Sequence, residues 1–274
     1  MKAEDFNFLS DMLKKRSGLI ISEDKLYLLE SRLVPLARKR GMEGLDDLVK
    51  AIRFSPEEQL LADVTEAMTT NESSFFRDIK PFDNFRNVAL PDMIERRGDK
   101  RSIRIWCAAA STGQEPYSLA MCLREEAEKL SGWRVEIVAT DLSKEVLDKA
   151  SVGLYSQFEV QRGLPIQLLM KYFNQVNDLW QIDSSIRAMV KFRSLNLLEK
   201  FSHLGAFDIV FCRNVLIYFD QPTKGEVLEN ISSLMPSDGY LFLGGAETVL
   251  GICDSFKPMD GYRGMYRLSP QTSH

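Results

Sequence analysis

The sequence predicts an α/β fold: a Rossmann-like domain that carries a small inserted antiparallel β-subdomain and follows an all-helical region. Residues 1–68 show apolar spacing typical of helices and no strand pattern. Residues 105–107 then form a short apolar run, followed by small residues at 108–113 and an amphipathic stretch from Tyr117. Strand, small-residue turn and helix in this order are typical of the start of a Rossmann-like unit, where a ligand approaches the backbone closely.

The next predicted strand, residues 135–141, ends in an acid. Asp141 lies at about the distance from the turn at which such folds place a ribose-binding carboxylate. The turn has one glycine, Gly113, and no phosphate-binding pattern, which favours a nucleoside without a pyrophosphate; S-adenosylmethionine (SAM) is the candidate. Two alternatives stay open: a tight turn without a ligand, and Asp141 as the N-cap of the following helix, although Ser143 can also cap it.

Composition limits the class of protein. The chain has 274 residues, 45% of them apolar, enough for one large or two modest domains with a sizeable core. A formal charge of −4 gives no reason to expect nucleic acid or an anionic membrane as a partner. No apolar run approaches the roughly 18 residues of a membrane span, and the start carries acids where a signal peptide would be apolar. We therefore expect a cytoplasmic protein.

Metal and triad chemistry are not expected. The four cysteines are scattered without CxxC spacing, which indicates reduced core thiols. A histidine-based metal centre or a Ser-His-Asp triad would depend on His203 alone, because the other histidine is the terminal His274. We therefore predict no metal.

Four helices are expected in the helical region. Pro35 should kink or break the second. Residues 45–54 form the third, and a capping box at 55–58, with proline at the first helical position, should open the fourth.

A basic face is predicted on the second helix. Lys25, Arg32 and Lys39 are spaced by seven residues and fall near one side. This face is either a solvated surface or a docking surface for an acidic partner.

Residues 69–77 are polar, then aromatic, then cationic. Their side chains are either ordinary caps or a binding site for a ligand carboxylate, with Arg77 as the charged donor. Residues 78–97 are predicted to be helical, interrupted by Pro81 and Pro91.

The regular alternation stops after Asp141. Residues 179–182 and 186–192 are predicted to form a hairpin or small antiparallel sheet, within an inserted subdomain at about 155–190. The central strand at 207–212 ends in a polar pair, which is where open α/β sheets place ligands. Residues 269–274 are expected to be a disordered polar tail.

Five stretches, in order, resemble one family: the CheR-type glutamate methyltransferases of chemotaxis receptors. They are TTNESSFFR at 69–77, AASTGQEPYS at 109–118, ATD at 139–141, LNLL at 195–198 and FCRNVLIYFD at 211–220. The resemblance covers nearly the whole chain. It implies a helical domain at 1–70 and a SAM-dependent methyltransferase domain at 71–274, with the β-subdomain inserted in the latter.

The resemblance also implies the site. The cofactor contacts carried over by position are Asn71, Ser73, Arg77, Glu115, Asp141, Asn196, Leu197, Arg213 and Asn214. Asp141 would hold the ribose hydroxyls, and Arg77 would handle the carboxylate charge of the cofactor or of the acceptor. Arg77 and Tyr218 are the expected catalytic residues, although Tyr218 has a core role as its alternative. Residues 244–247, GGAE, replace a GHSE-like segment of the family.

The implied reaction is methyl transfer from SAM to a glutamate side chain of a chemoreceptor, with S-adenosylhomocysteine as the second product. A glutamate of pKa about 4.3 is already ionised at neutral pH, so the reaction needs no strong base. Two alternatives remain: a SAM-binding interaction protein without transfer, and a methyltransferase for another acceptor.

The implied partner is the cytoplasmic domain of a chemoreceptor, docked on the Lys25, Arg32 and Lys39 face. Members that tether to a receptor's C-terminal peptide resemble one another in a glycine-containing insertion of the subdomain hairpin. Residues 174–178 have no glycine here, which predicts no such tethering. The chain is expected to be a monomer.

Overall fold

The computed structural model describes residues 1–269, so that all but the first residue of the predicted polar tail, His274 included, lies outside the described residues. The chain divides into two compact units. One comprises Met1–Thr70 together with Tyr218–Thr223, and the other comprises Asn71–Ile217 and the chain from Lys224 onward. Among the described residues, no helix is both long and apolar enough to cross a bilayer.

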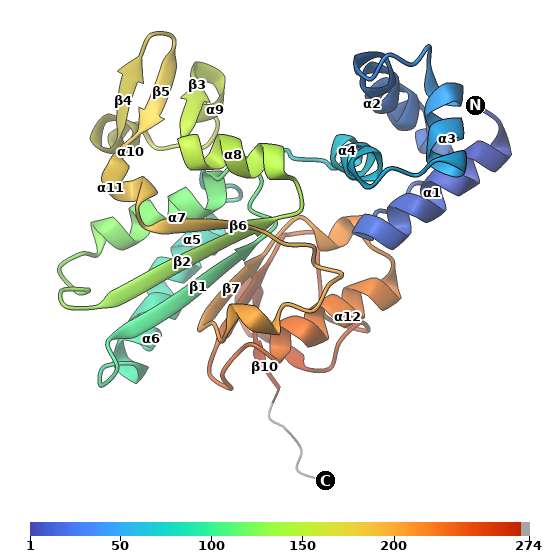
Figure 1. Cartoon of the computed structure of the whole chain (residues 1–274). Coiled ribbons are helices and arrows are strands. Elements are labelled where there is room, and N and C mark those ends of the chain that lie inside the picture. The colour runs from blue at the N-terminus through green and yellow to red at the C-terminus, as the bar shows by residue number, and fades with distance from the viewer. Residues whose placement is uncertain (270–274) are drawn as a thin grey trace. The chain divides into compact units, whose positions relative to one another are not determined.

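The first unit is a helical bundle with its own apolar core (Figure 1). Leu9, Leu13, Leu29, Leu33 and Val64 are fully buried in that core, and they recur at the three- and four-residue spacing that places side chains on one face of a helix. Its helices are α1 (Ala3–Ser17), the 3-10 turn η1 (Glu23–Lys25), α2 (Leu26–Lys39), α3 (Leu45–Phe54) and α4 (Glu58–Met68).

Two expectations about this unit need correction. Of the kink or break expected at Pro35, the break does not occur, because α2 continues through this residue to Lys39. Ser55 does not cap α4; it is the C-cap of α3, and its N–H donates to the Ala51 carbonyl. Helix α4 consequently begins at Glu58, with Glu57 at the N-cap and no side-chain cap.

The segment Tyr218–Thr223 belongs to the helical unit although the chain on both sides of it belongs to the other. The Ile20 N–H donates to the Tyr218 carbonyl at 3.0 Å. Lys14 pairs with Asp220 at 2.7 Å, and Asp220 also accepts the Thr223 N–H. The two units are therefore connected by the chain more than once.

The second unit is built on a seven-stranded sheet of order β6-β2-β1-β7-β8-β10-β9. The first five strands in this order are parallel, and β10 runs antiparallel to both of its neighbours. The strands are β1 (Ser102–Ala108), β2 (Arg134–Asp141), β6 (Val190–Ser194), β7 (Ile209–Cys212), β8 (Tyr240–Leu243), β9 (Phe256–Met259) and β10 (Tyr262–Leu268). The sequence analysis placed strands at 105–107, 135–141 and 207–212, which correspond to β1, β2 and β7.

Helices cover both faces of this sheet (Figure 1). One face carries α5 (Lys80–Asn84), a π-helical turn η2 (Phe85–Ala89), α6 (Leu90–Arg96) and α7 (Gln114–Glu125), which share a core with Ile105 and Phe211. The other face carries α12 (Gln221–Ser232). Trp106 contacts Phe201 edge to face and stacks on Phe207. Pro81 stands in the first turn of α5, where the missing N–H has no helical partner to lose. Pro91 directly follows the π-helical turn η2, and the helical chain continues through it without the predicted interruption.

The inserted subdomain is a three-stranded antiparallel sheet of order β3-β5-β4. Its strands are β3 (Leu154–Ser156), β4 (Phe173–Val176) and β5 (Leu179–Ile182), and its helices are α9 (Gln157–Gln161), α10 (Ile166–Tyr172) and α11 (Ser184–Arg187). The predicted pairing of 179–182 with 186–192 is wrong: β5 pairs with β4 and β3, while β6 joins the main sheet parallel to β2. The short helix α11 separates the two apolar runs and redirects the chain to the larger sheet.

Candidate cofactor site

The parallel strands bring the predicted site residues of the second unit to one edge of the sheet. The C-terminal ends of β6, β2, β1 and β7 lie side by side because these strands pair in parallel register. Asp141 ends β2, Arg213 follows β7, and Asn196 follows β6. This edge is where doubly wound sheets bind their ligands.

Asp141 connects two turns at this edge. Its Oδ2 accepts the Ser111 N–H at 2.8 Å, and its Oδ1 accepts the Ser143 N–H at 3.0 Å. The N-cap of α8 (Lys144–Val152) is Ser143, whose hydroxyl accepts the Val146 N–H, so capping does not explain Asp141. A carboxylate accepts hydrogen bonds and donates none, so the Asp141 side chain is of the type that binds hydroxyl donors.

The small-residue turn after β1 is held in a strained conformation. Ala109 and Ser111 have φ values of 64° and 50°, which non-glycine residues adopt rarely. The Tyr155 hydroxyl donates to the Thr112 carbonyl at 2.8 Å, and the Ala110 N–H donates to the Thr140 carbonyl at 2.8 Å. Strained backbone of this kind persists only where the surroundings over-determine it, and it clusters at functional sites.

The segment that follows the helical unit packs against this turn. The Ser111 hydroxyl donates to the Asn71 carbonyl at 2.7 Å, and the Phe76 N–H donates to the Ser118 hydroxyl at 3.0 Å. Phe75 is fully buried and contacts Tyr155 edge to face, with ring centroids 5.0 Å apart. Asn71 and the half-buried Ser73 are thereby fixed beside the predicted nucleoside site.

Arg213 is the central charge of the site. Its Nη1 donates to Glu115 at 2.7 Å, and its Nη2 donates to Asp78 at 2.7 Å and to the Arg77 carbonyl at 3.0 Å. Its side chain is 1% exposed. Burial raises the pKa of the Glu115 carboxyl, and the Arg213 guanidinium opposes that rise. Two residues predicted as separate cofactor contacts thus form one buried ion pair.

The remaining predicted residues fall into three groups. The Arg77 guanidinium is half-buried and donates to the Glu72 carbonyl at 3.0 Å. Beyond β6, Asn196 Oδ1 accepts the Leu198 N–H and Leu197 is buried. Tyr218 belongs to the helical unit, not to the unit that carries the rest of the site.

Sequence reasoning missed Glu247, a buried acid in the loop after β8. Its carboxylate accepts the N–H groups of Asn214, Val215 and Gly244 at 2.8, 2.9 and 2.6 Å. It also accepts the Ile217 N–H at 3.3 Å. The available signal was an acid in an otherwise small-residue loop at the end of a parallel strand.

The predicted docking face on α2 is not uniform. Lys25 and Lys39 are exposed. Arg32 is half-buried instead, and its Nη1 donates to the carbonyls of Met68 and Thr69 at 2.8 and 2.9 Å. Arg32 therefore satisfies the C-terminal carbonyls of α4, which a cation does well.

Comparison with known families identifies the chain. The all-alpha domain of the CheR methyltransferases matches residues 4–69, and the SAM-binding domain of the same family matches residues 71–265. The chain belongs to the CheR methyltransferase family. The family match thus confirms both the resemblance and the predicted fold class.

Curated relatives of this family align over almost the whole chain. A chemotaxis protein methyltransferase, Cher2, of Pseudomonas putida is 41% identical over 257 residues, which cover 92% of this chain and 93% of the relative. Chemotaxis protein methyltransferase 1 of Pseudomonas aeruginosa is also 41% identical, with the same coverage. Chemotaxis protein methyltransferase 1 of Vibrio cholerae is 37% identical over 93% of this chain and 92% of its own length.

The cofactor of this family domain is SAM, and the residues at the sheet edge fit it. A carboxylate, the chemical type that binds ribose hydroxyls, stands at the end of β2, and a cationic side chain suited to a carboxylate, Arg77, stands in the neighbouring segment. The turn between them presents only small side chains at 108–111. The buried Arg213 Nε also lacks a hydrogen-bond partner among the described residues, so the site retains an unused donor.

Gly163 provides a test of how the segment around Phe75 is held. A Cβ at Gly163 would lie 2.1 Å from the Phe75 carbonyl oxygen, with φ at +89°. Gly163→Ala should lower the free energy of unfolding by roughly 2–4 kcal/mol, because left-handed strain and overpacking add. Urea unfolding measures this loss.

The matched control is Gly261→Ala. Gly261 has a similar φ of +81°, but a Cβ there meets nothing within 4 Å. This variant should lose only about 1–2 kcal/mol, the cost of the left-handed conformation. Equal losses for the two variants would show that the contact between Gly163 and Phe75 does not restrain the segment.

Proposed function

We propose that this chain transfers the methyl group of SAM to glutamate side chains of chemoreceptors. The observation that carries the proposal is the family match, which extends over both units of the chain and includes every motif around the sheet edge. The names of the aligned relatives, chemotaxis protein methyltransferases, support the same acceptor class.

SAM supplies an electrophilic methyl group on a positively charged sulfur. One carbon–sulfur bond breaks and one carbon–oxygen bond forms, which gives a glutamyl methyl ester and S-adenosylhomocysteine. The acceptor carboxylate is ionised at neutral pH, so no protein group has to remove a proton. The protein's task is to align the two groups and exclude water, and alignment alone is worth about 7 kcal/mol or more in favourable cases.

Each residue of the site has a task in this proposal. Asp141 accepts the ribose hydroxyls while it holds the turns at Ser111 and Ser143. Arg77 binds a carboxylate, of the cofactor or of the acceptor. Arg213 and Glu115 fix the position of the backbone at Arg77, because Arg213 donates to its carbonyl. Tyr218 remains the second proposed catalytic residue.

Asp141→Asn tests the cofactor site. An amide NH₂ group in place of one carboxylate oxygen would oppose an N–H donor, so the affinity for S-adenosylhomocysteine should fall roughly 10- to 100-fold, the equivalent of a charged hydrogen bond. Isothermal calorimetry measures the affinity. The same variant should lose base-labile methyl transfer from tritiated SAM to chemoreceptor-containing membranes.

Asp183→Asn is the matched control for this experiment. Asp183 also accepts a backbone N–H, that of Ser185 at 2.7 Å, but it caps α11 in the subdomain. The affinity of Asp183→Asn for S-adenosylhomocysteine should match that of the wild type.

Wild-type protein that binds S-adenosylhomocysteine yet labels no receptor would favour a SAM-binding interaction protein or a different acceptor.

Arg77→Ala tests the proposed catalytic cation. Loss of a charged donor aimed at a carboxylate should reduce kcat/KM by on the order of 100-fold, while the thermal midpoint changes little because the side chain is only half-buried. Receptor methylation rates and calorimetric melting measure the two effects.

Arg162→Ala is the comparison, because Arg162 binds the carboxylate of Glu72 while Arg77 binds its carbonyl. Arg162 should matter little for the rate. A drop of the same size in both variants would mean that the segment's tether, and not the charge of Arg77, supports the reaction.

We also propose that Lys25 and Lys39 meet the acidic methylation region of the receptor. Both are exposed, whereas Arg32 is engaged with α4. The double variant Lys25→Glu/Lys39→Glu should lower receptor kcat/KM about 10-fold at low salt and leave S-adenosylhomocysteine affinity unchanged. The difference should shrink as salt rises, since surface charges are screened.

Lys15→Glu/Lys50→Glu is the charge-matched control on the same unit, since both lysines are exposed on other helices. If this control loses methylation equally, net charge alone is responsible and the α2 face is not a docking surface.

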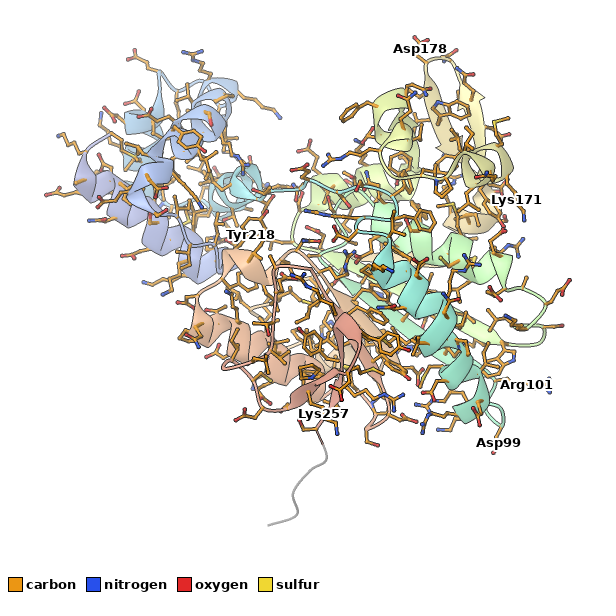
Figure 2. All side chains as sticks on the ribbon, turned by 180° about the vertical axis from the view of Figure 1, so that it is seen from behind. Asp99, Arg101, Lys171, Asp178, Tyr218 and Lys257 are labelled. Atoms are coloured by element: carbon orange, nitrogen blue, oxygen red, sulfur yellow. The ribbon has the colours of Figure 1, made fainter. Side chains whose placement is uncertain are left out.

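Tethering to a receptor's C-terminal peptide is not part of the proposal. The β4–β5 hairpin closes with a two-residue turn, Asn177 and Asp178, with Asp178 at its tip (Figure 2). This compact turn supports the expectation from the missing glycine. Co-sedimentation that depends on the receptor tail would contradict it.

A further inference from the structure

We infer that Glu247 is a positioning residue for the cofactor site: it fixes the loop after β7, on which Arg213 and Asn214 lie. This inference rests on the proposed function of that site. It is carried by the four backbone N–H groups that one carboxylate accepts from two separate loops.

The geometry explains why an acid is needed. An ionised carboxylate has about four acceptor positions and no donor, so four N–H groups can satisfy it fully. Asn214, Val215 and Ile217 supply three of these donors from the loop after β7, and Gly244 supplies the fourth from the end of β8. Glu247 is 8% exposed, so each bond is formed largely out of water, where hydrogen bonds to charged groups are strong.

The contact between the two loops is also tight. A Cβ on Gly244 would lie 2.7 Å from Glu247 Oε2 and 2.8 Å from Asn214 Nδ2. Any larger residue at 244 would therefore displace the carboxylate. Asn214 itself has a φ of 58°, a left-handed conformation that its anchored N–H helps to hold.

The consequence reaches the predicted cofactor contacts. Asn214 is one of them, and the preceding residue, Arg213, holds Glu115, Asp78 and the Arg77 carbonyl. A shift of the loop after β7 therefore moves the guanidinium that orders the other site elements. Positioning errors of about 1 Å can cost on the order of 100-fold in rate even when no reacting group changes.

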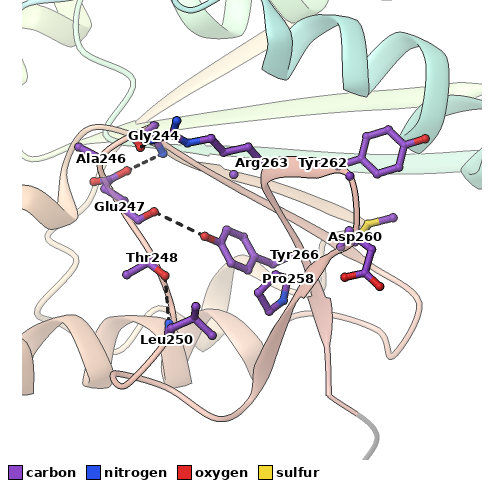
Figure 3. A pocket seen from close by; sticks show the side chains of 14 residues that line it. Gly244, Ala246, Glu247, Thr248, Leu250, Pro258, Asp260, Tyr262, Arg263 and Tyr266 are labelled. Carbon is purple, nitrogen blue, oxygen red and sulfur yellow. Dashed lines mark hydrogen bonds between the residues drawn. The ribbon is translucent and has the colours of Figure 1, made fainter.

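Glu247 also forms part of the wall of an open pocket of about 780 Å³ between the loop after β8 and the β9–β10 hairpin. Figure 3 shows the Tyr266 hydroxyl directed toward Glu247. This hydroxyl donates to the backbone carbonyl of Glu247 over 3.5 Å. Arg263 reaches from the hairpin to the Gly245 carbonyl at 2.8 Å. The loop that carries Glu247 is thus held from the hairpin side, so its carboxylate is a firm anchor for the loop after β7.

The test compares Glu247→Gln with Glu159→Gln. Glu159 likewise accepts a backbone N–H, that of Ser156 at 2.9 Å, but in the capping box of α9. Hydrogen exchange of the protein without ligand should show loss of protection at residues 214–217 and 244 only in Glu247→Gln. Calorimetry should show S-adenosylhomocysteine affinity reduced about 10-fold or more in Glu247→Gln and unchanged in Glu159→Gln, at a temperature well below both melting midpoints.

Gly244→Ala provides a second route if Glu247→Gln does not fold, because it displaces the carboxylate but keeps its charge. It should give the same pattern of exchange and affinity. The inference would be overturned if residues 214–217 kept their protection from hydrogen exchange in these variants. It would also be overturned if that protection were lost while the affinity for S-adenosylhomocysteine stayed within twofold of the wild type. Failure of the proposed function has a different signature: wild-type protein that binds S-adenosylhomocysteine but methylates no receptor leaves the Glu247 comparison intact.

Discussion

The site depends on the buried guanidinium of Arg213. It joins residues from three distant parts of the chain, because Glu115 lies in the first turn of α7, Asp78 precedes α5, and Arg213 itself follows β7. Burying a charge is costly unless partners and hydrogen bonds compensate, and removal of one partner leaves the others exposed to that cost. The arrangement therefore makes the first turn of α7 and the segment 71–78 mutually dependent. Neither can move without disturbing the same ion pair.

Sequence patterns predicted the parts of this site that follow from local rules. A strand ending in Asp141, a small-residue turn before α7 and a polar pair after β7 are each visible within a few residues. Parallel pairing then places them at one edge, because all the parallel strands point the same way. Ser143 as N-cap of α8 also follows from a local preference, and the structure confirms it.

The features that the sequence did not predict depend on contacts between distant segments. Arg32 looks like its neighbours on a basic helix face, but the carbonyls at the end of α4 bind it, 36 residues later in the chain. Ser55 fits a capping box for α4, but it is the C-cap of α3, where its N–H donates to the Ala51 carbonyl. The pairing of β5 with β4, rather than with the run at 186–192, is fixed by the two-residue turn and by α11. Periodicity alone contains none of this information.

The proposed carboxyl methylation suits a site built in this way. The proposed acceptor is ionised before it arrives, so the reaction would need no strong base. Its polar side chains are used instead to hold backbone: Asp141 and Glu247 accept N–H groups from four different turns, and Arg213 donates to a carbonyl. Strained residues such as Ser111 and Asn214 are stable only within this network. Because the backbone of the site is fixed before the cofactor binds, it does not have to reorder when the cofactor binds. That preorganisation is the main contribution a protein can make to a direct methyl transfer.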